Sequence, residues 1–165
     1  MPAKIIVIPV IFLFLGFLFF PSFSRAQTIQ EGDLIRASGD IDVWIVKYMG
    51  SKKFKRLVLS PHVFNSYSHL RWDNIIEVAP SLLNEYITSD LVRAQGDEKI
   101  YRLFPSGDTG TKRWIPTEQD FVSQGLDWDA VYTINTVDRN AYTTGTSITS
   151  GGSTGVSPTP APVTA

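Results

Sequence analysis

A duplicated segment is the feature that most constrains the fold of this 165-residue chain. The run DLIRASGD at 33–40 recurs as DLVRAQGD at 90–97, an offset of 57 residues. At the same offset, 55–58 (KRLV) matches 112–115 (KRWI) and Phe64 matches Phe121. After a one-residue gap the offset is 56, and there 70–73 (LRWD) matches 126–129 (LDWD) and Tyr86 matches Tyr142. Matches that keep one order with one gap predict two tandem copies of one unit, at residues 31–89 and 90–145.

Strand signals open each copy. β-branched and aromatic residues at 43–46 and 100–104 predict a strand, and turn-forming residues at 105–110 follow the second of these. A further strand is expected at 55–59 in the first copy and at 112–115 in the second, and a short strand at 33–37 and 90–94 precedes each hairpin. Each copy therefore begins with a short β-meander or hairpin of three strands.

Helix signals follow the hairpins. Ser60 before Pro61, and the run TEQD at 117–120, are typical of helix N-termini, and Gly125 predicts a helix end. The three-residue spacing of Trp72, Ile75 and Val78, repeated by Trp128, Val131 and Ile134, favours a second helical turn. A unit of about 57 residues buries too little surface to be stable alone. We therefore expect an α+β fold in which two repeats, each with one or two short helices, pack on each other.

The N-terminus predicts export. Lys4 precedes an apolar run at 5–20, and small residues at 24 and 26 occupy the −3 and −1 positions of a cleavage site before Gln27. Residues 1–26 are therefore predicted to be a signal peptide. A 16-residue helix spans about 24 Å, less than the roughly 30 Å of a bilayer core. An uncleaved N-terminal anchor is the alternative, and it would be the protein's one contact with the membrane. The expected location is secreted or on the cell surface.

Composition limits the functions that the chain can have. Without Lys4 and Arg25, 13 basic residues face 16 acidic ones, a balance that argues against nucleic-acid binding. The absence of cysteine excludes disulfides and thiolate metal sites. It also favours a bacterial source, since small secreted domains of eukaryotes often contain disulfides. From Thr143 onward the chain is nearly all Thr, Ser, Gly, Pro, Ala and Val. Such a segment buries too little apolar surface to become ordered, so 146–165 is predicted to be a disordered tail.

No catalytic or metal constellation stands out, and no cofactor is expected. The triplet at 108–110 (DTG) occurs in aspartic proteases, but the first copy lacks it, so a hairpin turn is the better interpretation. His62 and His69 lie seven residues apart, whereas helical zinc ligands are three or four apart. Asp127 and Asp129 flank Trp128 without indicating acid–base chemistry.

Six residues are candidates for binding. Four of them form the repeated basic pairs Lys55–Arg56 and Lys112–Arg113. These pairs are expected either to protect a sheet edge from aggregation or to contact a polyanionic wall polymer. A third possibility is pairing with aspartates of the neighbouring strand, namely Asp33, Asp40, Asp90 and Asp97. Tyr48 and Phe104, like Tyr67, have no counterpart in the other copy and are candidates for stacking on a sugar or peptide. The repeated aromatic positions, Trp44 with Tyr101 and Trp72 with Trp128, are predicted to lie in the core.

The KRWI strand at 112–115, followed by Phe121, Gly125 and Trp128, resembles a repeat of exported bacterial surface proteins. In that repeat a K-R-W-I strand precedes a helix and an F-x-x-L-G-[FY]-x-W stretch. Gln124 stands where the repeat has leucine, and the first copy has Leu57 in place of the tryptophan. The resemblance covers residues 33–142; it implies a surface module and no site residues.

These observations predict a non-enzymatic secreted or cell-surface module that binds an envelope polymer or a partner protein. A structural spacer without a ligand is the alternative. A small secreted hydrolase using Asp108 or Asp129 is a remote one.

Overall fold

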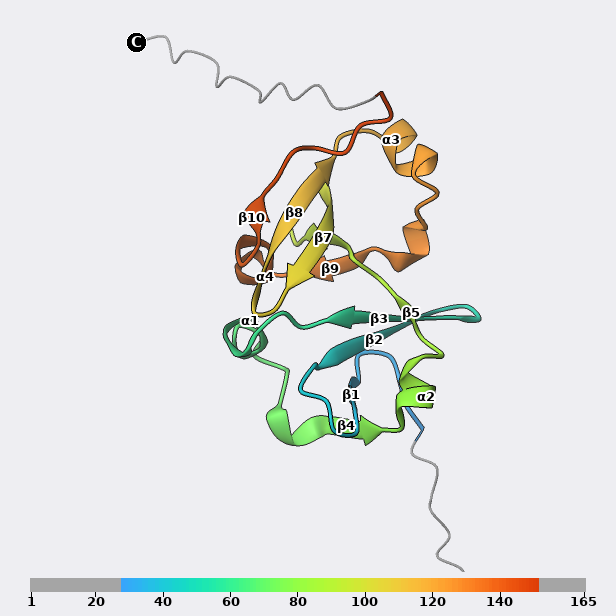
Figure 1. Ribbon diagram of the computed structural model, residues 1–165, viewed down its shortest axis with the longest axis vertical. Coiled ribbons are helices and arrows are strands. Elements are labelled where there is room, and N and C mark those ends of the chain that lie inside the picture. Colours follow the sequence, from blue (N-terminus) through green and yellow to red (C-terminus); the bar gives the residue numbers. More distant parts are fainter. Residues whose placement is uncertain (1–27, 152–165) are drawn as a thin grey trace, which may run out of the picture.

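The computed structural model describes residues 28–151 and contains two five-stranded sheets with four short α-helices, a mixed architecture compatible with the expected α+β class (Figure 1). We call residues 28–89 the first half and residues 90–151 the second half. The first sheet consists of β1 (Leu34–Ala37), β2 (Trp44–Met49), β3 (Lys52–Leu57), β4 (Ile75–Val78) and β5 (Ile87–Thr88). The second consists of β6 (Leu91–Ala94), β7 (Ile100–Ser106), β8 (Thr109–Ile115), β9 (Tyr132–Ile134) and β10 (Thr143–Thr144).

The helices lie in the connections between strands. The first half contains α1 (Pro61–Asn65), the 3₁₀ turn η1 (Trp72–Asn74) and α2 (Pro80–Leu83). The second half contains α3 (Glu118–Ser123), the 3₁₀ turn η2 (Trp128–Ala130) and α4 (Thr136–Asn140). The strand order is β4-β1-β2-β3-β5 in one sheet and, read from the corresponding edge, β9-β6-β7-β8-β10 in the other. In each sheet an antiparallel three-stranded meander is flanked by two parallel edge strands.

Two helix starts form as the sequence predicts. Ser60 caps α1 by accepting a hydrogen bond from the backbone N–H of Val63, and Thr117 caps α3 by accepting one from Asp120. These side chains satisfy N–H groups that have no partner within the first helical turn. Gly125 follows α3 with φ of 63°, a conformation that costs glycine little.

The helical turn predicted from the three-residue spacing of Trp72, Ile75 and Val78 forms only at its start, and the prediction is wrong for Ile75–Val78. One 3₁₀ turn starts at Trp72, and the chain then extends as β4, parallel to β1, with Ile76 opposite Ile35. In the second half, β9 runs parallel to β6 in the same way. The spacing misleads because β-branched residues after the turn find backbone partners on a neighbouring strand, which a local pattern cannot reveal. Each half consequently has five strands instead of three.

The main core spans both halves. Leu34, Phe54 and Phe64 of the first half pack in one buried cluster with Val92 and Phe121 of the second. Strand alternation explains this packing: along β2, Ile45 packs against this shared core, whereas Val46 is buried in a second cluster within the first half. The two halves therefore meet along one face of the first sheet (Figure 1).

The segment predicted to be a disordered tail becomes ordered as far as Gly151. β10 pairs with β8, and beyond it the backbone N–H of Ile148 donates to the carbonyl of Trp114 at 2.8 Å. Ile148 also packs against the shared core, and Ser150 donates to the Asp120 carboxylate. Backbone hydrogen bonding along β8 and one partly buried isoleucine offset the ordering entropy of 146–151. The rest of the predicted tail, 152–165, and the predicted signal peptide lie outside the described residues. No helix within 28–151 is long and apolar enough to cross a membrane.

Candidate functional site

Two clefts have an exposed tryptophan in the wall, one formed within the second half and one formed by the first half together with Asp108 of the second. The Trp72 cleft has a volume of about 290 Å³ and lies between the β1–β2 loop, the end of β3 and α1. The Trp128 cleft has a volume of about 530 Å³ and lies between the β6–β7 loop, the end of β8 and α3. The lining positions correspond through the sequence matches: Val43 with Ile100, Val58 with Ile115, Ser60 with Thr117, Phe64 with Phe121, and Trp72 with Trp128.

The tryptophans stack on buried phenylalanines. The ring of Trp72 lies 3.8 Å from that of Phe64, centroid to centroid, at an interplanar angle of 20°. Trp128 lies on Phe121 at 3.8 Å and 18°. Each phenylalanine is fully buried, but the tryptophans are 50 % and 48 % exposed. The prediction that both tryptophans are core residues is therefore wrong. They cover the core from outside and leave much of each indole in contact with solvent.

Carboxylates line both clefts, but only the Trp128 cleft also has a lysine in its lining. Asp42 and Asp108 line the Trp72 cleft, and burial, then the nearby Asp40 and Asp108 charges, raise the pKa of Asp42. The Trp128 cleft has Glu98 and Glu118 in its lining, but it also has Lys99 at the position that matches Asp42. The Trp72 cleft is therefore the more purely acidic.

Lys99 and Asp97 of the Trp128 cleft already have partners. The Lys99 ammonium lies 5.1 Å from the centroid of Trp114. Asp97 accepts a hydrogen bond from Arg139 at 2.9 Å; the backbone N–H of Lys99, and then Arg139, lower the pKa of Asp97. The Trp128 cleft thus contains a cation of its own.

Three of the four basic candidates are buried, so the expected polymer contact is wrong for them. Lys55 Nζ donates to the carbonyl of Leu83 at 2.7 Å, and Lys112 Nζ donates to that of Tyr142. Burial lowers the pKa of both lysines, and for Lys112 the charge of Arg139 adds to this effect. The expected pairing of the basic residues with aspartates of the neighbouring strand is also wrong, since these ammonium groups bind carbonyls beyond their own strands.

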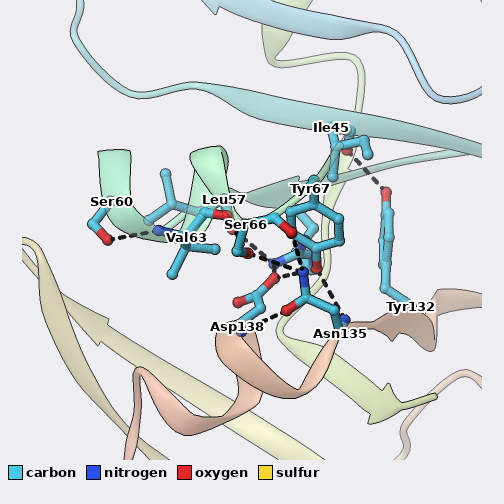
Figure 2. Close-up of polar contacts among 10 residues, drawn as sticks. Ile45, Leu57, Ser60, Val63, Ser66, Tyr67, Tyr132, Asn135 and Asp138 are labelled. Atoms are coloured by element: carbon cyan, nitrogen blue, oxygen red, sulfur yellow. Dashed lines mark hydrogen bonds and ion pairs between the residues drawn. The ribbon is translucent and has the colours of Figure 1, made fainter. Parts of the chain in front are cut away.

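Arg56, the third buried candidate, belongs to a polar network between the halves. Its Nη1 lies 3.0 Å from Oδ2 of the fully buried Asp138, and Tyr67 donates to the same oxygen at 2.7 Å. Asn135 donates its side-chain N–H to Ser66 Oγ at 2.9 Å and its backbone N–H to the Tyr67 hydroxyl. Figure 2 shows Ser66 and Tyr67 facing Asn135 and Asp138. Tyr67 is thus a junction residue and not an exposed stacking residue.

The remaining candidates, Arg113, Phe104 and Tyr48, lie apart from the clefts. The exposed Arg113 places its guanidinium 4.9 Å from the centroid of Phe104, which is 38 % exposed. Tyr48 is half-buried, and its hydroxyl lies 2.7 Å from that of Tyr86.

Of the acidic residues considered for catalysis, Asp108 lines the Trp72 cleft with Asp42, whereas Asp127 and Asp129 meet at Lys52. Asp108 lies in the turn between β7 and β8. Asp127 and Asp129 both accept hydrogen bonds from Lys52 at 2.7 Å, which links the two halves at the surface. Within residues 28–151, no group of three or more His, Cys, Asp or Glu side chains is placed to hold a metal ion.

No protein-family model, curated protein or solved structure matches the chain. The Trp72 and Trp128 clefts are therefore the features of the molecule that point to a function. The sequence did not reveal Trp72 and Trp128 as cleft residues, because tryptophans at matching positions suggest core packing. A signal was present in the polar neighbours, since Trp72 lies between Arg71 and Asp73, and Trp128 between Asp127 and Asp129.

Proposed function

We propose that residues 31–89 and 90–145 are two copies of one unit, and that the protein is a non-enzymatic, exported module that binds a glycan polymer of the cell envelope through its Trp72 and Trp128 clefts. One observation carries the proposal: the same cleft, with a half-exposed tryptophan stacked on a buried phenylalanine, occurs at matching positions in both halves.

Backbone geometry supports the two copies. The glycines at 39 and 96 have φ of 84° and 78°, and those at 50 and 107 have φ of 59° and 57°. These matching left-handed turns accompany the common strand order.

The chemistry of the clefts favours a sugar ring. An indole with one face against phenylalanine and the rest exposed offers a flat apolar surface, on which the C–H face of a pyranose can stack. Carboxylates at the rim, such as Asp42 and Glu98, can accept hydrogen bonds from sugar hydroxyls. Clefts of this size with a few polar groups are typical of small-ligand sites.

The presence of two clefts favours a polymer. A chain that occupies one cleft offers its next units to the other at high effective concentration, so modest affinities combine. The predicted signal peptide would bring the protein to such a polymer outside the cytoplasm.

Binding of the purified protein to insoluble cell-wall polysaccharide tests the proposal. We expect Trp72→Ala and Trp128→Ala each to weaken binding about tenfold, which corresponds to one lost stacking contact, and the double variant to weaken it further. Ile87→Ala is the matched control, because Ile87 is an exposed apolar residue that lines neither cleft, and it should bind as the wild type does.

Other outcomes would assign another function. Binding that survives the double substitution would exclude the clefts. Release of soluble sugar during the assay would identify a hydrolase. Retention on surface proteins alone would identify a protein partner, and self-association without any ligand would favour the spacer.

A further inference from the structure

A third cavity, of about 380 Å³, lies where the two halves meet and is separate from the Trp72 and Trp128 clefts. The first half contributes Trp44 and Arg56 to its lining, and the second half contributes Leu103, Phe104 and Tyr142. Its volume is near the lower end of the range of small-molecule sites. Phe104 is partly exposed, so the cavity has an aromatic residue that reaches the surface.

Two buried polar side chains in this lining have atoms without a partner. Arg56 is 3 % exposed and Tyr142 is 1 % exposed. Within residues 28–151, neither Nε of Arg56 nor the hydroxyl of Tyr142 makes a hydrogen bond. Burial raises the pKa of Tyr142 to about 12, so its hydroxyl keeps its proton at neutral pH and can donate it. Buried polar atoms without partners are uncommon in folded proteins, and Oδ1 of Asp138, which is ion-paired with Arg56, is a third one. The oxygen of a bound ligand would give the two donors an acceptor.

The first half shows what occupies the corresponding place. Tyr142 matches Tyr86 in the sequence, and the Tyr86 hydroxyl lies 2.7 Å from the hydroxyl of Tyr48, with the two rings edge to face. The residue that matches Tyr48 in the second half is Pro105, which lines the third cavity. The registers agree, since Tyr48 pairs with Lys53, Pro105 pairs with Gly110, and these partners also match at the offset of 57. The second half therefore lacks the phenol ring that satisfies Tyr86 in the first.

We propose that the third cavity binds a small phenol, whose ring packs between Trp44 and Phe104 and whose oxygen accepts hydrogen bonds from Tyr142 and Arg56. The ligand would supply from outside the group that Tyr48 supplies within the first half. This site does not depend on glycan binding at the Trp72 and Trp128 clefts.

Titration of the purified protein with 4-methylphenol, the side chain of tyrosine, tests this site, and toluene serves as the probe without oxygen. We expect 4-methylphenol to bind at least tenfold more tightly than toluene, about the contribution of one buried hydrogen bond. Tyr142→Phe should remove this preference. Tyr86→Phe, the matched control, should keep it, because Tyr86 does not line the cavity.

Two further measurements distinguish a phenol from a bound water. Without ligand, Tyr142→Phe should leave the midpoint of urea unfolding unchanged or raise it, since it removes an unpartnered hydroxyl, whereas Tyr86→Phe should lower it. Pro105→Tyr should fill the cavity and abolish 4-methylphenol binding. Equal binding of both probes, no binding of either, or a midpoint that Tyr142→Phe lowers as much as Tyr86→Phe would overturn the proposal.

Discussion

The first half pairs Tyr86 with Tyr48, whereas the second half places Pro105 beside the cavity that Tyr142 lines. The packing around these tyrosines differs as well. Tyr86 belongs to a cluster formed within the first half, but Tyr142 belongs to the core that both halves share. Matching sheet positions thus close a small core within the first half and open toward the neighbouring half in the second.

The two KR pairs show the same contrast. Arg56 is buried and paired with Asp138, but its sequence match Arg113 is exposed beside Phe104. Asp138 itself matches Leu82, which makes no such contact. The two arginines occupy matching positions, but only Arg56 faces an aspartate across the junction, so the difference between Asp138 and Leu82 decides which arginine is buried.

The largest expected effect separates the two arginines. Arg56→Ala leaves Asp138 buried without its cation, so it should lower the free energy of unfolding by about 3–5 kcal/mol. Arg113→Ala should lower it by less than about 0.5 kcal/mol, as is usual at an exposed position. Urea unfolding of the two variants measures the difference. Equal losses would show that the junction does not depend on the buried pair.

The tryptophans should instead behave alike. Trp72→Ala and Trp128→Ala each remove a stacking contact and part of a buried indole, so each should cost about 1–2 kcal/mol of stability. Thermal unfolding of both variants, each compared with the wild type, measures the two losses of stability. A loss confined to one variant would mean that the two stacks are not equivalent.

A smaller loss of stability, equal in the two halves, is expected when either of two glycines is replaced. Gly39 and Gly96 have positive φ, and a Cβ added at either position meets no atom within 4 Å. Alanine there should cost about 1 kcal/mol through backbone strain alone. Urea unfolding of Gly39→Ala and Gly96→Ala should therefore give the same midpoint shift, and unequal shifts would reveal contacts specific to one half.

The smallest effect concerns the ion pairs at the surface of the junction. The hydrogen bond from Lys52, and then the backbone N–H of Asp129, hold the pKa of Asp127 below its usual value. A lowered carboxyl pKa stabilises the fold at neutral pH, and this contribution is lost as the pH falls through the folded-state pKa. The stability difference between wild type and Lys52→Ala should therefore shrink both in acid and at high salt. A difference that is constant from neutral pH to pH 3 would contradict this origin.

Much of the local structure could be predicted from the sequence. The hairpin strands follow from β-branched and aromatic runs, and the starts of α1 and α3 follow from Ser60 and Thr117, because these signals act within a few residues. The edge strands β4 and β9 could not be predicted in the same way. Their hydrogen-bond partners, β1 and β6, lie about 40 residues earlier in the chain.

The candidate site was less accessible to sequence reasoning. The sequence matches single out Trp72 and Trp128, but a match between two positions does not distinguish a core residue from a residue in the wall of a cleft. The same is true of Lys55 and Arg56, which read as surface charges until a carbonyl and a buried carboxylate are found opposite them.

The hairpins and the helix caps follow from the amino-acid sequence, since each depends on neighbours along the chain. The fold is needed to show which charges are buried, which face of each indole meets water, and where Pro105 leaves a cavity. Those features depend on what the other half of the molecule places against each side chain, and no local pattern encodes that.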